Sequence, residues 1–254
     1  MFDLSGSVAI ITGGHGNLAE AIAQTLAQLG CSIALTARKV EQCEALAQRL
    51  TLAHGTHAIS VATDVSNEQD VRRLIEMTSD ALGPVDIVVN SAAAFWAAAP
   101  EDVPIERGWR RVLDVNLTGT FLVSQEAGRI MLAHGRGSII NLSSTGGLKS
   151  FLPEVGSTLS YTTSKGAIIN LTRDLAAQWS GRGVRVNAIA PGSMDAGMTH
   201  TIPKDHQDLM IRTIPMGRQG RASELMGAVA YLASSASSYV TGTVLVVDGG
   251  QTIV

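Results

Sequence analysis

A phenol and an ammonium four positions apart, Tyr161 and Lys165, are the pair in this sequence best suited to move a proton. On a helix, side chains four apart share a face, so the two groups would be neighbours. The pKa of a tyrosine is ordinarily about 10, too high for efficient proton transfer at neutral pH, and a nearby ammonium lowers it. The spacing therefore indicates general acid–base chemistry, although Tyr-x-x-x-Lys alone most often marks a surface pair.

Two polar residues upstream favour the chemical interpretation. Ser144 follows a predicted strand at the carboxyl edge of the sheet, where open α/β sheets bind their ligands. Asn116 falls within a long predicted helix, and an amide on its apolar face needs a polar partner such as a water or a lysine. We expect these two residues to join Tyr161 and Lys165 in one catalytic site.

A glycine-rich turn joins the first predicted strand to the first predicted helix. Glycines let the backbone approach a pyrophosphate, and a helix N-terminus offers free N–H groups and a positive dipole end. The spacing Gly14-x-Gly16-x-x-Ala19 matches the dinucleotide-binding pattern, although a plain glycine turn remains the alternative. The expected cofactor contacts in this turn are Gly13, His15, Gly16, Asn17 and Leu18.

The end of the second predicted strand bears on the choice of cofactor. Enzymes that prefer NAD usually carry an acidic residue there, which binds the ribose 2′-hydroxyl. Here the strand is followed by Arg38 and Lys39, and an arginine can clamp a 2′-phosphate with two hydrogen bonds. This favours NADP, with NAD as the alternative if the two cations only begin a solvated helix.

Short, mostly apolar runs bounded by Gly, Pro, Asn or Asp alternate with helical segments along the whole chain. Strands that are apolar on both faces are typical of a parallel sheet covered on both sides, so we predict a single-domain α/β Rossmann-type fold. The doubly wound sheet would have seven strands, at 7–12, 32–37, 58–63, 87–91, 138–143, 184–190 and 243–248. The least regular stretch, about 192–215, would form either a substrate lid or an ordinary surface loop.

Composition excludes several other classes. The chain has 254 residues and a formal net charge of −3, which does not favour nucleic-acid or membrane-surface binding. Its two cysteines, Cys31 and Cys43, are expected to be free thiols, and no Cys/His spacing suggests a metal site. We see no signal peptide and no apolar run long enough to span a bilayer, so we expect a cytoplasmic protein.

The chain resembles the short-chain dehydrogenase/reductase superfamily, most closely its sugar-acid dehydrogenases and 3-oxoacyl reductases. The resemblance covers nearly all of the sequence, and it rests on motifs that occur in family order and spacing. These are the Thr12-Gly13 turn, Asp64-Val65, Asn90-Ser-Ala-Ala93, Asn116, Ser144, Tyr161-x-x-x-Lys165, Asn187-Ala-Ile-Ala-Pro191-Gly192 and the ending Tyr239 to Gly250.

The resemblance implies a role for each matching residue. Tyr161 would be the general acid in reduction and the base in oxidation, Ser144 would bind the substrate oxygen, and Lys165 would hold the nicotinamide ribose. Asn116 would anchor a water that relays protons from Lys165 to solvent. Asp64 would bind the adenine amino group beside Val65. Further cofactor contacts are implied for Asn90 and Ala92 on the adenine-ribose side, and for Pro191, Gly192 and Met194 at the nicotinamide.

The sequence departs from the family pattern at several places. Asn17 and Ala19 replace two glycines of the phosphate turn, and Ala196 replaces a threonine that commonly binds the carboxamide. Asparagine tolerates a left-handed backbone best among the other residues, so we expect the turn to survive. The segment between Ser144 and Tyr161 is longer than usual. Phe151 within it, and Phe95 with Trp96, are expected to wall a substrate pocket, unless the latter two plug the core.

We expect an NADP-dependent carbonyl reductase or alcohol dehydrogenase acting on a medium-sized ketone or secondary alcohol, as a homotetramer. Sugar acids would instead need polar groups such as Lys149, His200 and Lys204. The alternatives are an NAD-dependent polyol or sugar-acid dehydrogenase and, in another class, a non-catalytic NADP-binding sensor.

Overall fold

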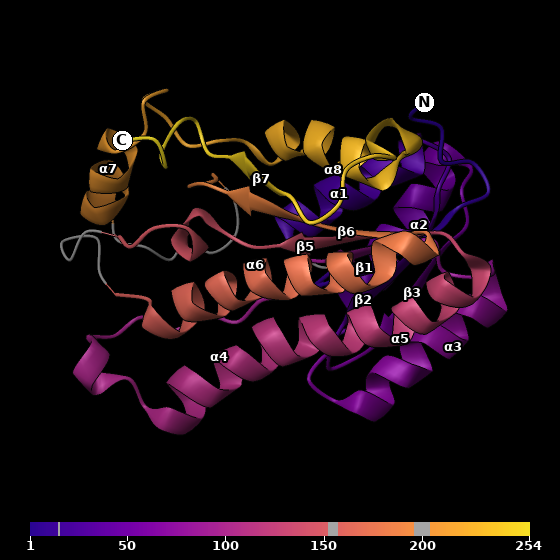
Figure 1. The fold of residues 1–254 in the computed structure, drawn as a ribbon, viewed down its shortest axis with the longest axis horizontal. Coiled ribbons are helices and arrows are strands. Elements are labelled where there is room, and N and C mark those ends of the chain that lie inside the picture. Colours follow the sequence, from indigo (N-terminus) through magenta and orange to yellow (C-terminus); the bar gives the residue numbers. More distant parts are fainter. Residues whose placement is uncertain (15, 152–156, 196–203) are drawn as a thin grey trace.

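The computed structural model describes residues 1–14, 16–151, 157–195 and 204–254. The predicted fold class is confirmed: all strands join one parallel sheet in the order β3-β2-β1-β4-β5-β6-β7 (Figure 1). Each predicted strand lies within two residues of the observed one at either end. The strands are β1 Val8–Thr12, β2 Ser32–Ala37, β3 Ala58–Ala62, β4 Ile87–Asn90, β5 Gly137–Leu142, β6 Val184–Pro191 and β7 Val244–Val247.

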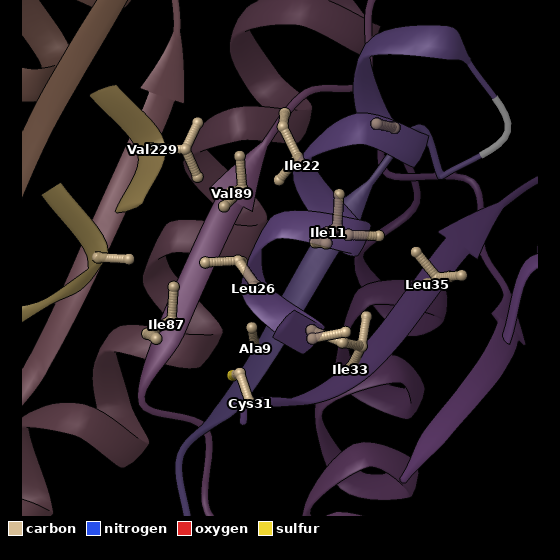
Figure 2. Packing of buried hydrophobic residues seen from close by; sticks show 14 of the residues in the cluster. Ala9, Ile11, Ile22, Leu26, Cys31, Ile33, Leu35, Ile87, Val89 and Val229 are labelled. Carbon is tan, nitrogen blue, oxygen red and sulfur yellow. The ribbon is translucent and has the colours of Figure 1, made fainter. Parts of the chain in front are cut away.

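Side chains that alternate along the strands fill two separate cores. Ala9 and Ile11 of β1 pack with helices on one face, whereas Ile10 between them packs on the other. Figure 2 shows the first core, in which Ile22 and Leu26 of a helix lie over neighbouring strands. Because both faces are covered, the strands need apolar residues at every position, which is the pattern that the sequence displays.

The helices divide between the two faces. The first core contains α1 Asn17–Gln28, α2 Glu41–His54 and α8 Met226–Ala233. The second contains α3 Glu68–Leu82, α5 Gly119–His134 and α6 Leu159–Trp179, and Figure 1 shows α5 and α6 running side by side under the sheet. Helix α7, Lys204–Arg212, lies near the C-terminus.

The long helix predicted from residue 106 to 134 is not a uniform α-helix. Two wider π-helical turns, η2 Ile105–Arg110 and η3 Asp114–Thr118, flank the short α4 Arg111–Leu113 before α5 begins. Such π turns insert extra residues into a helix and frequently occur at functional sites. Here the second turn carries Asn116.

The strand order places a topological switch point at β1, because the chain leaves β1 for β2 on one side and later returns to β4 on the other. Open α/β sheets bind ligands in the crevice beyond the carboxyl ends of the strands at this point. Most of the predicted site residues follow those strand ends. Among the described residues, no helix is long and apolar enough to cross a membrane.

Candidate active site

Ser144, Tyr161 and Lys165 come together at the carboxyl end of β5. Ser144 lies two residues after the end of β5, and its hydroxyl lies close enough to the Tyr161 phenol to lower the pKa of that phenol. Lys165 lies one turn further along α6, with Nζ 5.5 Å from the centre of the Tyr161 ring. Its ammonium donates to the carbonyl oxygen of Leu142 at 2.6 Å. The Ser144 hydroxyl and the Tyr161 phenol therefore lie close together, with the Lys165 ammonium near the phenol ring.

A close approach of two backbones holds this arrangement in place. A Cβ on Gly147, in the turn after β5, would lie 2.6 Å from the carbonyl carbon of Lys165. The Ser143 hydroxyl also donates to the Lys165 carbonyl oxygen at 2.8 Å. The start of α6 is therefore fixed against the end of β5, which sets the separation of Ser144 from Tyr161.

The electrostatics of the protein alone differ from the sequence-based expectation. Burial lowers the pKa of Lys165 to about 8, because an ammonium loses hydration there. Burial also raises the pKa of Tyr161, and the hydrogen bond with Ser144 opposes this only in part. The expectation that the lysine would lower the pKa of the phenol is thus not met in the protein alone, where lost hydration dominates.

Asn116 has different partners from those expected. Its Oδ1 accepts from the backbone N–H of Ala94 at 2.6 Å, and its Nδ2 donates to the Ala94 carbonyl and to Ser164 Oγ at 3.0 and 2.9 Å. These contacts use both N–H donors of Nδ2 and one acceptor site of Oδ1, and the expected relay water stays a prediction. Ser164 in turn donates to the Tyr161 carbonyl at 2.6 Å. Asn116 therefore stabilises the position of Tyr161 indirectly, through Ser164 and the backbone carbonyl of Tyr161.

The turn after β1 forms a close-fitting cradle. Gly13 has φ +72°, and a Cβ there would lie 2.9 Å from Ala92 Cα, so both conformation and space require glycine. The Thr12 hydroxyl accepts from the backbone N–H groups of Ser91 and Ala92, both at 3.0 Å, which ties the turn to the end of β4.

The N-terminus of α1 begins directly after this turn. Gly16 is its N-cap residue without a side-chain cap, so the first N–H groups of Asn17 and Leu18 remain available for an anion. Asn17 is helical and not left-handed, which corrects the reason given for its tolerance. Ala19 is buried against the sheet, as its small size allows. His15 lies outside the described residues. These features fit the pyrophosphate of a dinucleotide.

Arg38 and Asp64 lie side by side at the same sheet edge. They follow β2 and β3, and the two strand ends are joined by a hydrogen bond from Thr63 N to the Ala37 carbonyl at 3.0 Å. Arg38 is exposed and forms no ion pair within the described part of the chain. Asp64 is engaged by Ser66 and Arg111, which hold the pKa of its carboxyl below the usual value against the opposing effect of burial.

Two further residues predicted to contact the cofactor, Asn90 and Val65, are held by other protein groups. Asn90 is almost fully buried, and its Nδ2 donates to Ser124 Oγ and Asn141 Oδ1 at 3.0 and 2.9 Å. Its Oδ1 is buried and has no partner among the described residues, and the contact of Asn90 with a cofactor stays a prediction. Val65 is buried against Gly119 at the start of α5, which places it beside Asp64.

Pro191 is the last residue of β6, and Gly192 and Met194 follow it. A Cβ on Gly192 would lie 2.7 Å from Asp248 Cα, so this backbone is pressed against the loop after β7. Met194 is buried and pairs in a short parallel bridge with Gly220. The predicted lid at 192–215 is described only in part, because residues 196–203, with Ala196 and His200, lie outside the described residues.

Two of the predicted pocket residues flank the catalytic groups. The Phe95 ring meets the Tyr161 ring edge-on, with centroids 5.8 Å apart and planes at 70°. Phe151 lies against the turn after Ser144, where its ring would be 2.9 Å from a Cβ on Gly146. Trp96 instead packs over Gly108 of η2, with its indole nitrogen buried and unpaired. Trp96 is half-buried there, and its place in the substrate pocket stays a prediction.

Three residues that sequence reasoning missed also contribute. Ser164 donates to the Tyr161 carbonyl, and its position three residues after Tyr161 on the same helix was the only available signal. Arg111 pairs with Asp64 across 47 positions, and Gln251 accepts through its carbonyl from Lys149 across 102 positions. No local pattern marks contacts over such distances.

Comparison with known proteins agrees with this geometry. A family model described as enoyl-(acyl carrier protein) reductase matches residues 14–252. Galactitol 2-dehydrogenase (L-tagatose-forming) of Cereibacter sphaeroides is 38% identical over 100% of this chain and 98% of its own. A probable NADP-dependent mannitol dehydrogenase of Yarrowia lipolytica is 35% identical over 98% of this chain and 88% of its own.

Solved structures give the same result. The NADPH-dependent 3-quinuclidinone reductase of Rhodotorula rubra superposes with a TM-score of 0.94 at 32% identity, over 100% of this chain and 94% of that one. The chain belongs to the short-chain dehydrogenase/reductase superfamily of oxidoreductases, which use a nicotinamide cofactor.

Proposed function

We propose that this protein is an NADP(H)-dependent oxidoreductase that interconverts a ketone and a secondary alcohol. The observation that carries the proposal is the convergence of the Ser144 hydroxyl and the Tyr161 phenol, with the Lys165 ammonium 5.5 Å from the phenol ring. A phenol hydrogen-bonded to a second hydroxyl suits one oxygen atom that changes between carbonyl and alcohol.

The chain supplies the proton side of the reaction. Ser144 would donate a hydrogen bond to the substrate oxygen and stabilise the negative charge that develops there. Tyr161 would give that oxygen a proton in reduction and remove it in oxidation. The bound nicotinamide would supply or accept the hydride. Lys165 has three N–H donors, and the described residues occupy one of them, so it can also hold the ribose.

The residues around the turn after β1 support a nicotinamide dinucleotide. Gly13, Gly16 and the free N–H groups of α1 would bind the pyrophosphate, and Asp64 would meet the adenine. The exposed Arg38, with no acidic residue at the end of β2, favours the 2′-phosphate of NADP. The names of the mannitol dehydrogenase and the quinuclidinone reductase agree with this choice.

The pocket favours a ketone with an apolar side. Phe95 and Phe151 lie at the catalytic groups. Lys149, a candidate partner for a sugar acid, donates instead to the carbonyls of Gln251 and Val254. A polyol remains the second candidate, since galactitol 2-dehydrogenase is similar to this chain over its whole length.

The test is NADPH oxidation across cyclic apolar ketones and keto-sugars, with Tyr161→Phe and Tyr239→Phe compared to the unchanged protein. Tyr239 is fully exposed, so its variant controls for loss of a hydroxyl. We expect Tyr161→Phe to lower kcat by about 10³-fold and Tyr239→Phe to leave it unchanged. Turnover by neither class of substrate, or equal turnover in both variants, would refute the proposal.

We further propose that the chain assembles into a homotetramer. Strand β7 is an edge strand, and its apolar Val244–Val247 are partly exposed, which supports burial against another copy. Light scattering on the purified protein measures the assembly, and a monomer at micromolar concentration would contradict it.

A further inference from the structure

Two carboxylates beside the carboxyl ends of β2 and β3, those of Asp64 and Asp70, each pair with an arginine. Asp64 Oδ2 lies 3.4 Å from Arg111 Nη2, and Asp70 Oδ1 lies 2.9 Å from Arg73 Nη2. Arg38 stands beside them without an ion pair among the described residues. Arg38 and the neighbouring exposed Lys39 are therefore the cations at this edge that form no ion pair among the described residues, and only Arg38 has a guanidinium that can hold a phosphate with two hydrogen bonds.

Arg111 reaches Asp64 from a distant element. It begins α4, and it also donates to Ser66 Oγ at 3.3 Å. The other oxygen of Asp64, Oδ1, already accepts from Ser66 N and Oγ at 3.1 and 2.6 Å. The carboxylate is consequently held in one orientation, and its charge is paired with that of Arg111.

After Arg111, Arg38 is the arginine with the next largest effect on the pKa of Asp64. Both arginines stabilise the ionised carboxylate and lower its pKa, and the effect of Arg111 is the larger. If Arg111 were absent, two consequences would follow. A bare carboxylate would repel a nearby dianionic phosphate, and it would attract Arg38 away from that phosphate.

We propose that Arg111 is a specificity-determining residue for the cofactor, because it neutralises Asp64 and so leaves Arg38 free for the 2′-phosphate of NADP. Arg111 acts through Asp64 and is a positioning residue that does not itself contact the phosphate. This inference rests on the proposed NADP preference. It adds a second determinant, 47 positions from Asp64, to the one at the end of β2.

The test measures the dissociation constants of NADPH and NADH by nicotinamide fluorescence at fixed low salt, without substrate. We expect Arg111→Gln to reduce the preference for NADPH over NADH about fivefold, mainly through weaker NADPH binding. Arg110→Gln is the matched control, because Arg110 is the adjacent arginine and pairs with Glu106 at 2.8 Å instead. It should leave the preference unchanged. Arg111→Lys keeps the charge and should retain most of it.

A double-mutant cycle with Asp64→Asn tests the route of the effect. If Arg111 acts by neutralising Asp64, then Arg111→Gln should have no further effect on the preference in the Asp64→Asn background. A fivefold effect that persists in that background would show that Arg111 contacts the phosphate itself, and would overturn the inference. An unchanged preference in Arg111→Gln alone would overturn it as well.

The unchanged protein and Arg38→Gln separate this inference from the proposed function. If the unchanged protein binds NADH more tightly than NADPH, the NADP proposal fails and the inference fails with it. If Arg38→Gln loses the preference while Arg111→Gln keeps it, only the inference fails. Circular dichroism and the midpoint of thermal unfolding verify that each variant is folded, and Arg111→Met, which also removes the charge, replaces Arg111→Gln if the latter is not.

Discussion

Replacing Lys165 by methionine should change the stability of the protein in a pH-dependent way. Lys165 is 3% exposed, and burial lowers its pKa from 10.5 to about 8. The gap corresponds to about 3 kcal/mol by which the folded state disfavours the ammonium at neutral pH. Methionine has a similar length and no charge, so the variant does not carry this penalty.

The sign follows from proton linkage. Below a pH of about 8 the lysine is charged in both states, and the full penalty weakens the folded protein. As the pH rises from about 8 towards 10.5, the folded state loses its proton first, and the penalty fades. Above 10.5 both states are neutral and the penalty is gone. The advantage of Lys165→Met over the unchanged protein should therefore shrink by about 2.5 kcal/mol between pH 7 and pH 10.

The change with pH is a cleaner observable than the absolute difference. Methionine also leaves the Leu142 carbonyl without its donor, which costs about 1–3 kcal/mol. That loss is present at both pH values, because a neutral amine donates as well, so it largely cancels in the comparison.

Equilibrium urea unfolding of the cofactor-free protein at pH 7 and pH 10 measures this change. Lys39→Met, at an exposed position, is the control for losing a surface lysine. A difference between Lys165→Met and the unchanged protein that is the same at both pH values would refute the reasoning, since Lys165 would then keep its ordinary pKa. Turnover by Lys165→Met should fall in either case.

Two further predictions concern the cradle and the thiols. Gly13→Ala should lower the free energy of unfolding by about 2 kcal/mol or more and weaken NADPH binding, because its φ of +72° and the 2.9 Å approach to Ala92 both exclude a Cβ. Gly55→Ala, with φ +67° and open space around it, should lose only about 1 kcal/mol and bind NADPH normally; equal losses in urea unfolding would contradict the role of the close approach. Burial raises the pKa of Cys31 to about 12 and that of Cys43 to about 11, so neither thiol should react with Ellman's reagent at pH 8 until urea is added. Rapid labelling of the folded protein would show that these thiols are not shielded.

The fold class, the strand positions and the grouping of Ser144, Tyr161 and Lys165 could be predicted from the sequence alone. Apolar runs such as Val8–Thr12 are typical of strands that are buried on both faces. Such strands belong to parallel sheets that helices cover on both sides. The Tyr161–Lys165 spacing and the turn at Gly13 are equally local, since helix periodicity and backbone conformation act over a few residues.

The partners of the individual side chains depend on the tertiary structure and could not be predicted from the sequence. The Asn116 side chain meets the backbone of Ala94 22 positions away, a contact that no pattern near Asn116 in the sequence marks. Lys149 is bound by carbonyls near the C-terminus, and Arg111 is bound by Asp64. Such pairs depend on how the strands are ordered and how the loops run, and neither leaves a local pattern. Burial depends on the whole packed molecule. In the protein alone it raises the pKa of Tyr161, whereas the neighbouring Lys165 was expected to lower it.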